Sequence, residues 1–551
     1  MKLVFSDGRV LEAAAGARLL EVIKANALDP EKTILAAFAG NKIRELSYVL
    51  PDAAEQLDLE LVGMGSLDGI RIYQRSASFV LIKALGELQP QARIRILHSV
   101  ANGLYCEVKK GPPLTASFIK ELEVKMREIT AADLPFEREE VPVAEAIRVF
   151  KKSGSDDKAR LLSYRPSDKA SIYRLGGLAN YFYGYLAPST GYIKHFALSL
   201  YDNGFILQLP SLNSPNKVGP VRKNRKLYEV FKETLRWREI LEVPDVSMLN
   251  EVINSKRFIE FVLISEAFHE KKIAQIADMI TERGKTKVVL ISGPSASGKT
   301  TFTKRLAIQL RINGRKPLLV SMDDYFLDRD KTPKDEKGAH NFETPLALNI
   351  EMFKDHMREI IAGREIELPR YDFKTGTNSM SGTKIIPGDQ SVVLVEGIHG
   401  LNPVFTEDLP VESIFKIYVS ALTEIPLDRH NRIPTADTRL LRRIIRDSQF
   451  RCYGAADTIA RWPSVREGET KYVFSHQEEA DVFFNTALIY EHAALKTIAE
   501  PVLRAVSPDT RAYAEALRLL KFLAYFLPVP VDVIPRHSIL REFLGSSSFK
   551  Y

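Results

Sequence analysis

The residues of this chain best suited to chemistry follow a short apolar run. Val288 to Ile291 leads into Gly-Pro-Ser-Ala-Ser-Gly-Lys-Thr at 293–300, which fits the pattern G-x-x-x-x-G-K-[ST]. A helical pattern follows from Thr301 to Leu310, so the motif has the strand–loop–helix context of a phosphate-binding loop. Its two glycines let the loop turn N–H groups toward a phosphate, and the helix adds the positive end of its dipole.

This loop predicts a site for the phosphates of ATP. Lys299 would reach the β- and γ-phosphates, and the Thr300 hydroxyl would bind Mg²⁺. The residues expected to contact the nucleotide here are Gly293, Ser295, Ser297, Gly298, Lys299, Thr300 and Thr301.

Acidic side chains follow two other strand-like runs. Leu318 to Ser321 precedes Asp323, and Val392 to Val395 precedes Glu396. The carboxyl ends of parallel strands share one edge of a sheet, so both acids should lie beside the phosphate loop. Asp323 could accept a proton from an attacking hydroxyl or orient it, and Glu396 could hold Mg²⁺ directly or through water. A strand-end carboxylate that only faces solvent is the alternative for each acid.

A run of arginines lies further along the chain. Arginines recur at helical spacing at positions 439, 442, 443 and 446, and Arg451 follows. The run could be a solvated basic helix face. Beside a phosphate loop we interpret it as a lid, because guanidinium groups bond phosphate oxygens in a forked geometry and stabilise charge on a transferred group.

Composition places few other constraints on function. The 551 residues are too many for one core, and 45% hydrophobic with 27% charged residues is ordinary for a globular protein. The net charge of +7 suits anionic ligands without requiring nucleic acid. The only cysteines, Cys106 and Cys452, cannot form a disulfide framework or a cysteine-based zinc site. With neither an apolar signal stretch nor a membrane-spanning segment, we expect a cytoplasmic protein and no membrane partner.

Strand and helix patterns divide the chain into five segments. Between 284 and 500 strand-like runs alternate with helical patterns such as Ile350 to Ile361, which predicts a parallel sheet with helices on both faces. Short strand patterns flank the turn signal Asp7-Gly8 near the N-terminus. We predict a multidomain chain that combines α+β and α/β folds. Its predicted segments are 1–62, 63–224, a helical linker at 225–283, 284–500 and a helical tail at 501–551.

The C-terminal half resembles the uridine kinase / phosphoribulokinase family, and within it the uridine–cytidine kinases. The resemblance implies that Asp323 is the catalytic base. It also implies that Glu343, in the Asn-Phe-Glu-Thr-Pro motif at 341–345, holds the ribose hydroxyls where the family has an aspartate. Tyr371 of Tyr-Asp-Phe would line the nucleoside pocket.

The same resemblance assigns roles to the lid. Arg443 matches the family's substrate-contacting arginine, and Arg446 and Arg451 match its lid arginines. The catalytic set is therefore expected to be Asp323, Lys299, Arg443 and Arg446, with Arg446 and Arg451 also contacting the nucleotide.

Base recognition departs from the family pattern. The histidine that recognises the pyrimidine base falls on Gly376, a substrate-side arginine falls on Tyr453, and a base-side glutamine falls near Arg461. The phosphate machinery and the ribose acid are thus kept, whereas the base-binding residues are different. We expect kinase chemistry, with uridine or cytidine as the family substrate and another base or acceptor left open.

The N-terminal half resembles threonyl-tRNA synthetases. Residues 1–62 are similar to their ubiquitin-like TGS domain, with its β-grasp fold, and residues 63–224 to their second additional domain, which carries the editing site. Segments at 102–108 and 188–196 resemble two stretches of that domain. The family's four zinc ligands fall on Arg75, Phe79, Phe182 and Leu186. None of these can hold zinc as the family ligands do, which implies an editing fold without the editing chemistry.

Together these features predict an ATP- and Mg²⁺-dependent kinase acting on the 5′-hydroxyl of a ribonucleoside. One alternative is another acceptor, such as a different ribose-bearing molecule or a sugar phosphate. A second is an RNA- or ribosome-associated regulator that uses the loop as a nucleotide switch and contacts RNA through the N-terminal half. The tail motif from Ile534 to Gly545 has an apolar strip that we expect to pack. Kinases of this kind are often homo-oligomers, but no pattern here identifies an interface.

Overall fold

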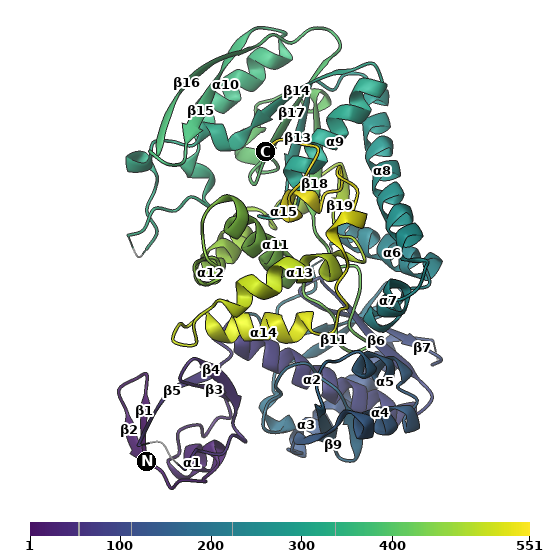
Figure 1. Ribbon diagram of the computed structural model, residues 1–551, viewed down its shortest axis with the longest axis vertical. Helices are drawn as coiled ribbons and strands as arrows, with labels where there is room; N and C mark the ends of the chain where they lie inside the picture. The colour runs from purple at the N-terminus through teal and green to yellow at the C-terminus, as the bar shows by residue number, and fades with distance from the viewer. Residues whose placement is uncertain (53–54, 112, 223, 337) are drawn as a thin grey trace.

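The computed structural model describes residues 1–551 except 53–54, 112, 223 and 337. The N-terminal sheet and the region that follows it lie at one end of the molecule, and a second, all-parallel sheet lies at the other (Figure 1). The long helix α8 (Phe258–Glu282) runs along one side, and helices near the C-terminus fill the middle (Figure 1). In the described part of the chain, no helix combines the length and apolar character needed to cross a membrane.

The N-terminal sheet has five strands in the order β2-β1-β5-β3-β4. Strand β1 pairs parallel with β5 and antiparallel with β2, and helix α1 packs Leu19, Val22 and Ile23 into the core beside Leu3 and Phe5. The elements are β1 (Lys2–Phe5), β2 (Val10–Glu12), α1 (Leu19–Ala25), β3 (Ile34–Ala39), β4 (Lys42–Glu45) and β5 (Gln56–Gly63).

The second region packs helix α2 (Leu67–Leu88) against antiparallel sheets. Ser66 caps α2 by accepting a hydrogen bond from the Gly69 N–H at 3.1 Å. The sheets have the orders β11-β12-β7-β6 and β10-β9-β8. Their elements are β6 (Arg93–Val100), β7 (Gly103–Lys109), α3 (Ala116–Ala131), β8 (Glu137–Pro142), α4 (Val143–Lys152), α5 (Asp156–Ser163), β9 (Lys169–Leu175), β10 (Leu178–Asn180), β11 (Ala197–Tyr201) and β12 (Gly204–Gln208).

Apolar packing fills most of the positions that would correspond to zinc ligands. Phe79, Phe182 and Leu186 are buried in one hydrophobic cluster, and the rings of Phe79 and Phe182 lie 5.4 Å apart. Arg75, on the same face of α2, instead donates from Nε to the Tyr185 carbonyl at 2.9 Å. Three of the four side chains therefore belong to the hydrophobic core, and the fourth, Arg75, contributes a guanidinium group beside it.

Three helices lie in the segment between the N-terminal sheets and the parallel sheet. They are α6 (Arg225–Ile240), α7 (Val246–Ile253) and α8 (Phe258–Glu282). Val243, Pro244 and Asp245 lie between α6 and α7, where the Asp245 carboxylate accepts from the Met248 N–H at 3.2 Å and caps α7.

The C-terminal half has a five-stranded sheet in the order β14-β17-β13-β18-β19, with every neighbouring pair parallel. The fold class predicted from the alternation of patterns is confirmed, and β13, β14 and β17 contain the three predicted runs 288–291, 318–321 and 392–395 with one to three further residues each. All five residues of β13 are buried, as the central position in the sheet requires. The strands are β13 (Val288–Ser292), β14 (Lys316–Ser321), β17 (Ser391–Gly397), β18 (Ile414–Ser420) and β19 (Val482–Asn485).

Helices surround this sheet, and one hairpin projects from it (Figure 1). The hairpin, β15 (Ile366–Asp372) with β16 (Thr377–Ile385), is antiparallel and was not predicted. The helices are α9 (Lys299–Ile312), α10 (Ile350–Ile361), α11 (Thr435–Phe450), α12 (Ala455–Tyr472) and α13 (Glu491–Arg504).

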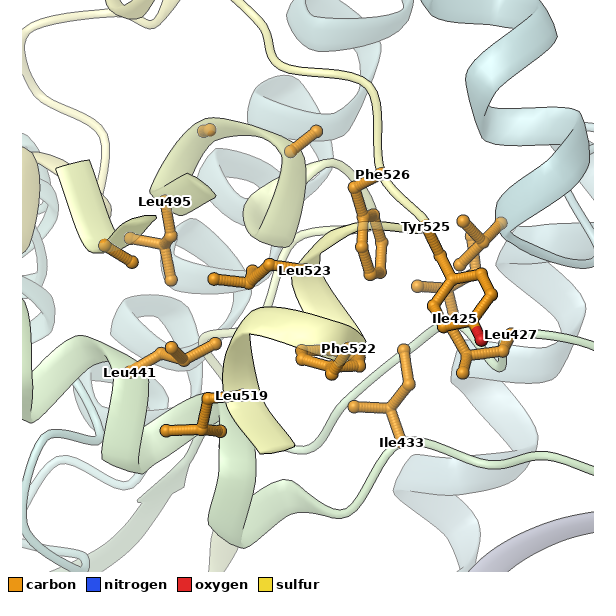
Figure 2. Close-up of a cluster of buried hydrophobic side chains, with 14 of the residues drawn as sticks. Ile425, Leu427, Ile433, Leu441, Leu495, Leu519, Phe522, Leu523, Tyr525 and Phe526 are labelled. Atoms are coloured by element: carbon orange, nitrogen blue, oxygen red, sulfur yellow. The ribbon is translucent and has the colours of Figure 1, made fainter. Parts of the chain in front are cut away.

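The C-terminal tail joins the core between the halves. Helix α13 continues past the predicted segment boundary at 500, and α14 (Tyr513–Leu523) packs beside it. Leu519, Phe522 and Leu523 of α14 lie among buried side chains of α11, α13 and the 425–433 loop (Figure 2). The last helix, α15 (Arg541–Leu544), returns the chain to the parallel sheet.

Candidate phosphate-transfer site

The phosphate loop joins the central strand β13 to helix α9. A Cβ added to Gly293 would lie 1.9 Å from the Val419 carbonyl oxygen of β18, so only glycine fits this close approach. Gly298 has a φ of +84°, in the left-handed region that glycine favours. The loop therefore has the backbone conformation that its two glycines predict, and it leads into the first turn of α9, whose N–H groups have no partner within the helix.

Lys299, Thr300 and Glu396 meet at the carboxyl end of the sheet. Lys299 Nζ lies over the loop, 2.8 Å from the Gly293 carbonyl oxygen. The Thr300 hydroxyl donates to the Glu396 carboxylate at 2.8 Å, joining the end of β17 to the start of α9. Hydroxyl and carboxylate oxygens are ligands that a hard divalent cation prefers. Burial raises the pKa of Glu396 to about 7, although Lys299 and the Thr300 hydrogen bond oppose the rise.

Asp323 lies beside this group, in the 3₁₀ turn η2 (Met322–Tyr325) that follows β14. The Ser321 hydroxyl accepts from the Asp323 N–H at 3.2 Å and fixes the turn. The carboxylate is accessible to solvent, but protein atoms crowd its sides. This partial dehydration raises its pKa, while the charges of Lys299, Arg451 and Arg446 lower it. Asp323 thus lies within the electrostatic reach of both the loop lysine and the lid.

The arginine run divides into two sets. The side chains of Arg439 and Arg442 are almost fully buried, and they pair with Glu469 and Glu491 respectively. They are structural, because their guanidinium groups bond protein carboxylates and carbonyls.

The remaining arginines gather around Asp447, a buried carboxylate. Arg443 and Arg446 lie 3.3 and 3.0 Å from it, and the more exposed Arg451 lies 3.7 Å away. Arg443 also donates from Nη1 to the Ser295 hydroxyl of the phosphate loop at 2.8 Å. The structure therefore brings the predicted lid arginines together, with Arg443 at the loop itself.

Glu343 and Tyr371 lie near the same turn, with Glu343 within reach of the charge of Asp323 and the Tyr371 N–H 3.5 Å from the Asp324 carboxylate. Burial raises the pKa of Glu343 to about 7, and the charge of the neighbouring Glu469 adds to the rise. The charges of Asp323 and Lys299 also act on this carboxylate. A Cβ on Gly468 would lie 2.4 Å from the Glu343 Cβ, so helix α12 packs on this acid through a glycine. The Tyr371 ring is buried against Phe326, and among the described residues its hydroxyl has no hydrogen-bond partner.

The positions that depart from the kinase pattern form contacts of their own. Gly376 has a φ of +76°, and a Cβ there would lie 2.7 Å from Nε of Arg329. The Arg329 guanidinium thus occupies space beside the position where the pattern has a histidine. The Arg461 guanidinium lies over the Tyr453 ring at 4.4 Å, so these two substitutions contact each other.

The sequence interpretation missed two carboxylates at the phosphate loop. Glu469 of α12 accepts from the Ser295 N–H at 2.9 Å. Glu542 of α15 accepts from the Thr301 N–H at 3.2 Å and from its hydroxyl at 2.7 Å, and the Tyr551 hydroxyl also contacts that threonine. The expected packing of the tail's apolar strip is confirmed, since Ile539, Leu540, Phe543 and Leu544 are buried. No local pattern near residue 542 points to a contact with residue 301.

Comparisons with known proteins match two different parts of the chain. Residues 288–489 match the model of the "Phosphoribulokinase / Uridine kinase family". Threonine–tRNA ligases of Desulforamulus reducens and Oleidesulfovibrio alaskensis are 32% and 33% identical over 199 and 194 residues, or 36% and 35% of this chain. The matched residues lie in the N-terminal part of the chain. They span only 31% and 30% of the ligases' own length.

Two solved structures align with about a third to a half of the chain. A "Possible Uridine Kinase from Bacillus stearothermophilus" is 21% identical with a TM-score of 0.26, covering 36% of this chain and 89% of its own. The D-glycerate 3-kinase of Cryptococcus neoformans is 15% identical with a TM-score of 0.23, covering 46% and 87%. On the evidence of the family match, the C-terminal half is a P-loop kinase domain of the phosphoribulokinase / uridine kinase family, which implies ATP binding, and the N-terminal part resembles threonine–tRNA ligases.

Proposed function

We propose that this protein transfers the γ-phosphate of ATP to the 5′-hydroxyl of a ribonucleoside. The observation that carries the proposal is the place of Asp323 directly after β14, whose Ser321 pairs with Glu396 of β17, within reach of the charges of Lys299, Arg446 and Arg451. An acceptor hydroxyl that reaches Asp323 would also lie beside the phosphate loop. Phosphoryl transfer requires mainly positioning and charge stabilisation, and a carboxylate that orients the acceptor and takes its proton is the remaining requirement.

The residues at the end of β17 fit a magnesium ion. The Thr300 hydroxyl and the Glu396 carboxylate lie 2.8 Å apart, and both are hard oxygen donors. Mg²⁺ bound there would neutralise charge on the β- and γ-phosphates. Lys299 would move from the Gly293 carbonyl to the phosphates, and Arg443, already bonded to Ser295, would approach them from the lid.

Glu343 and Tyr371 are proposed to hold the sugar. A carboxylate accepts two hydrogen bonds, one on each oxygen, which suits the neighbouring 2′- and 3′-hydroxyls of a ribose. The Tyr371 hydroxyl is buried without a partner among the described residues, so a ligand hydroxyl would remove an energetic cost of roughly 1–3 kcal/mol. These features favour a ribose-bearing acceptor over a nucleotide switch, which needs no second substrate.

The base is the least constrained part of the proposed substrate. Gly376 leaves room that the Arg329 guanidinium fills, and Arg461 stacks on Tyr453. A cation beside the base pocket favours a ring or substituent that accepts hydrogen bonds. Because Gly376 stands where the kinase pattern has its pyrimidine-recognising histidine, a non-pyrimidine nucleoside or another ribose-bearing acceptor is the second candidate.

Asp323→Asn tests the proposal. The amide keeps the shape of the side chain but cannot take the acceptor proton, so we expect transfer to fall by about 10²–10⁴-fold. ATP binding by calorimetry should stay within a few-fold of wild type. Asp330→Asn, on an exposed turn, is the matched control and should leave turnover unchanged. Turnover by Asp323→Asn within a few-fold of wild type would remove Asp323 from the role of base.

A further inference from the structure

A cavity away from the phosphate-transfer site is lined by residues of β4, helix α2 and helix α14. These three elements lie close together in Figure 1. The volume of the cavity is about 690 Å³, within the range of sites that bind small molecules. It is bounded by β4, α2, the loop at 181–185 and α14, and contains none of the phosphate-loop or lid residues. We call it the junction pocket.

Helix α14 forms one wall of this pocket because its other face is fixed in the core. Leu519, Phe522 and Leu523 are buried against the kinase half (Figure 2). The helical period then leaves Arg518 and Lys521 on the pocket side. Since α14 is anchored through its apolar face, the pocket wall is rigid.

Positive charge predominates in the junction pocket. Nine Lys or Arg residues line it, against three Asp or Glu residues. Four of the nine are paired: Arg71 and Arg518 with Glu515, Arg138 with Glu45 and Lys169 with Glu140. These four cations are neutralised by carboxylates of the protein itself, so they need no ligand.

The other five cations have no carboxylate partner within the described ranges of the chain. They are Lys42, Arg44, Arg75, Arg165 and Lys521. Unpaired cations that line one cavity repel one another, and this repulsion lowers the stability of the folded protein. An anionic ligand would supply the missing charge.

Arg75 is partly buried, whereas Lys521 is more exposed and lies within reach of the charges of Arg165 and Arg44. Burial lowers the pKa of Arg75, and its guanidinium has only the Tyr185 carbonyl as a hydrogen-bond acceptor among the described residues. A Cβ on Gly184 would lie 2.6 Å from the Arg75 Cζ, so the glycine makes room for this cation. Burial also lowers the pKa of Lys521, and the charges of Arg138, Arg165 and Arg44 lower it further.

Tyrosine rings supply the rest of the lining. Tyr173, Tyr181, Tyr183, Tyr185 and Tyr525 line the cavity. Tyr183 and Tyr185 are partly exposed. The other three are buried, with the Tyr173 hydroxyl bonded to Glu45 and those of Tyr181 and Tyr525 bonded to each other. The Lys521 ammonium lies 5.9 Å from the Tyr185 ring centroid. Such rings offer flat faces for stacking and hydroxyls for hydrogen bonds. The pocket thus combines a cationic part with an aromatic part.

We propose that the junction pocket binds a nucleotide, with its phosphate on Arg75 and Lys521 and its base against Tyr183 and Tyr185. Guanidinium binds phosphate in a forked geometry, and aromatic faces stack on any base. A mononucleotide fits the cavity volume. The proposal is independent of the phosphate-transfer site, because no residue is shared.

The test is calorimetric titration of the full chain carrying Lys299→Ala, with AMP, UMP and pyrophosphate in separate arms. We expect one AMP or UMP bound per chain, and pyrophosphate bound more weakly because it lacks a base. Arg75→Met with Lys521→Met should weaken nucleotide binding by at least about tenfold. The matched control, Lys120→Met with Arg148→Met, removes two exposed cations from the same region and should change nothing.

A second variant distinguishes a specific loss of binding from misfolding. Gly184→Ala keeps every charge but displaces the Arg75 guanidinium, and it should weaken binding while the melting temperature stays near that of the parent. Binding that the double variant does not affect would overturn the proposal, as would pyrophosphate binding as tightly as AMP. Binding of a short single-stranded RNA in the absence of any mononucleotide binding would also overturn it and identify a polymer site.

Discussion

The contact between the C-terminal tail and the phosphate loop leads to a specific prediction. The Glu542 carboxylate accepts two hydrogen bonds from Thr301, one from its N–H and one from its hydroxyl. Thr301 lies in the first turn of α9, where N–H groups and the helix dipole favour an anion. Nucleotide phosphates and Glu542 therefore compete for the same donors.

Glu542→Gln should strengthen ATP binding. A hydrogen bond to a charged acceptor contributes roughly 1.5–3 kcal/mol, against about 1 kcal/mol for a neutral one. The amide keeps the shape of the side chain but loses the charge, so displacing it should cost about 1.5 kcal/mol less, which corresponds to about tenfold tighter binding.

Calorimetry with a non-hydrolysable ATP analogue measures this difference. Glu412→Gln is the control, since that exposed acid precedes β18 at the opposite end of the strand from the phosphate loop. The gain should shrink as salt is added, because part of it is charge repulsion. Binding that is unchanged or weaker in Glu542→Gln would refute the competition and make the tail carboxylate a supporting part of the site.

Two further predictions concern the acceptor side and the joint between the halves. Because the pKa of Glu343 is raised to about 7, its carboxylate forms as the pH rises through that value, so KM for the ribonucleoside should fall between about pH 6 and pH 8. Glu343→Gln should flatten this profile, and a flat wild-type profile would contradict the role. Lys158 and Asp428, 2.7 Å apart and buried, join the halves, so Lys158→Met should lower the unfolding free energy by about 3–5 kcal/mol. Urea titration measures it, and a loss below about 1 kcal/mol would contradict a buried-pair role.

The sequence predicted the parts of the fold that local patterns encode. The five strands of the parallel sheet were recognisable because buried strands are continuous apolar runs, and the glycine pattern marked the loop at 293–300. The hairpin β15–β16 was missed because most residues of β16 are exposed and carry no apolar alternation. The pattern of apolar residues therefore identified the buried strands of the parallel sheet but not the exposed hairpin.

The site required tertiary information. In the sequence, Arg439 and Arg442 have the same helical spacing as Arg443 and Arg446 and cannot be told apart from them. Only the packing of the folded chain determines which of these guanidinium groups pair with buried carboxylates. The contact of Glu542 with the phosphate loop spans 241 residues, so no local signal could reveal it.

The central claim is that this kinase domain phosphorylates a ribose-bearing acceptor. The direct measurement is ATP consumption with Mg²⁺ against a panel of ribonucleosides, their 2′-deoxy analogues and sugar phosphates. We predict turnover with at least one ribonucleoside, little or none with its 2′-deoxy analogue, and loss of that turnover in Asp323→Asn. Tight ATP binding without turnover on any acceptor would contradict the claim and favour a nucleotide-dependent regulator.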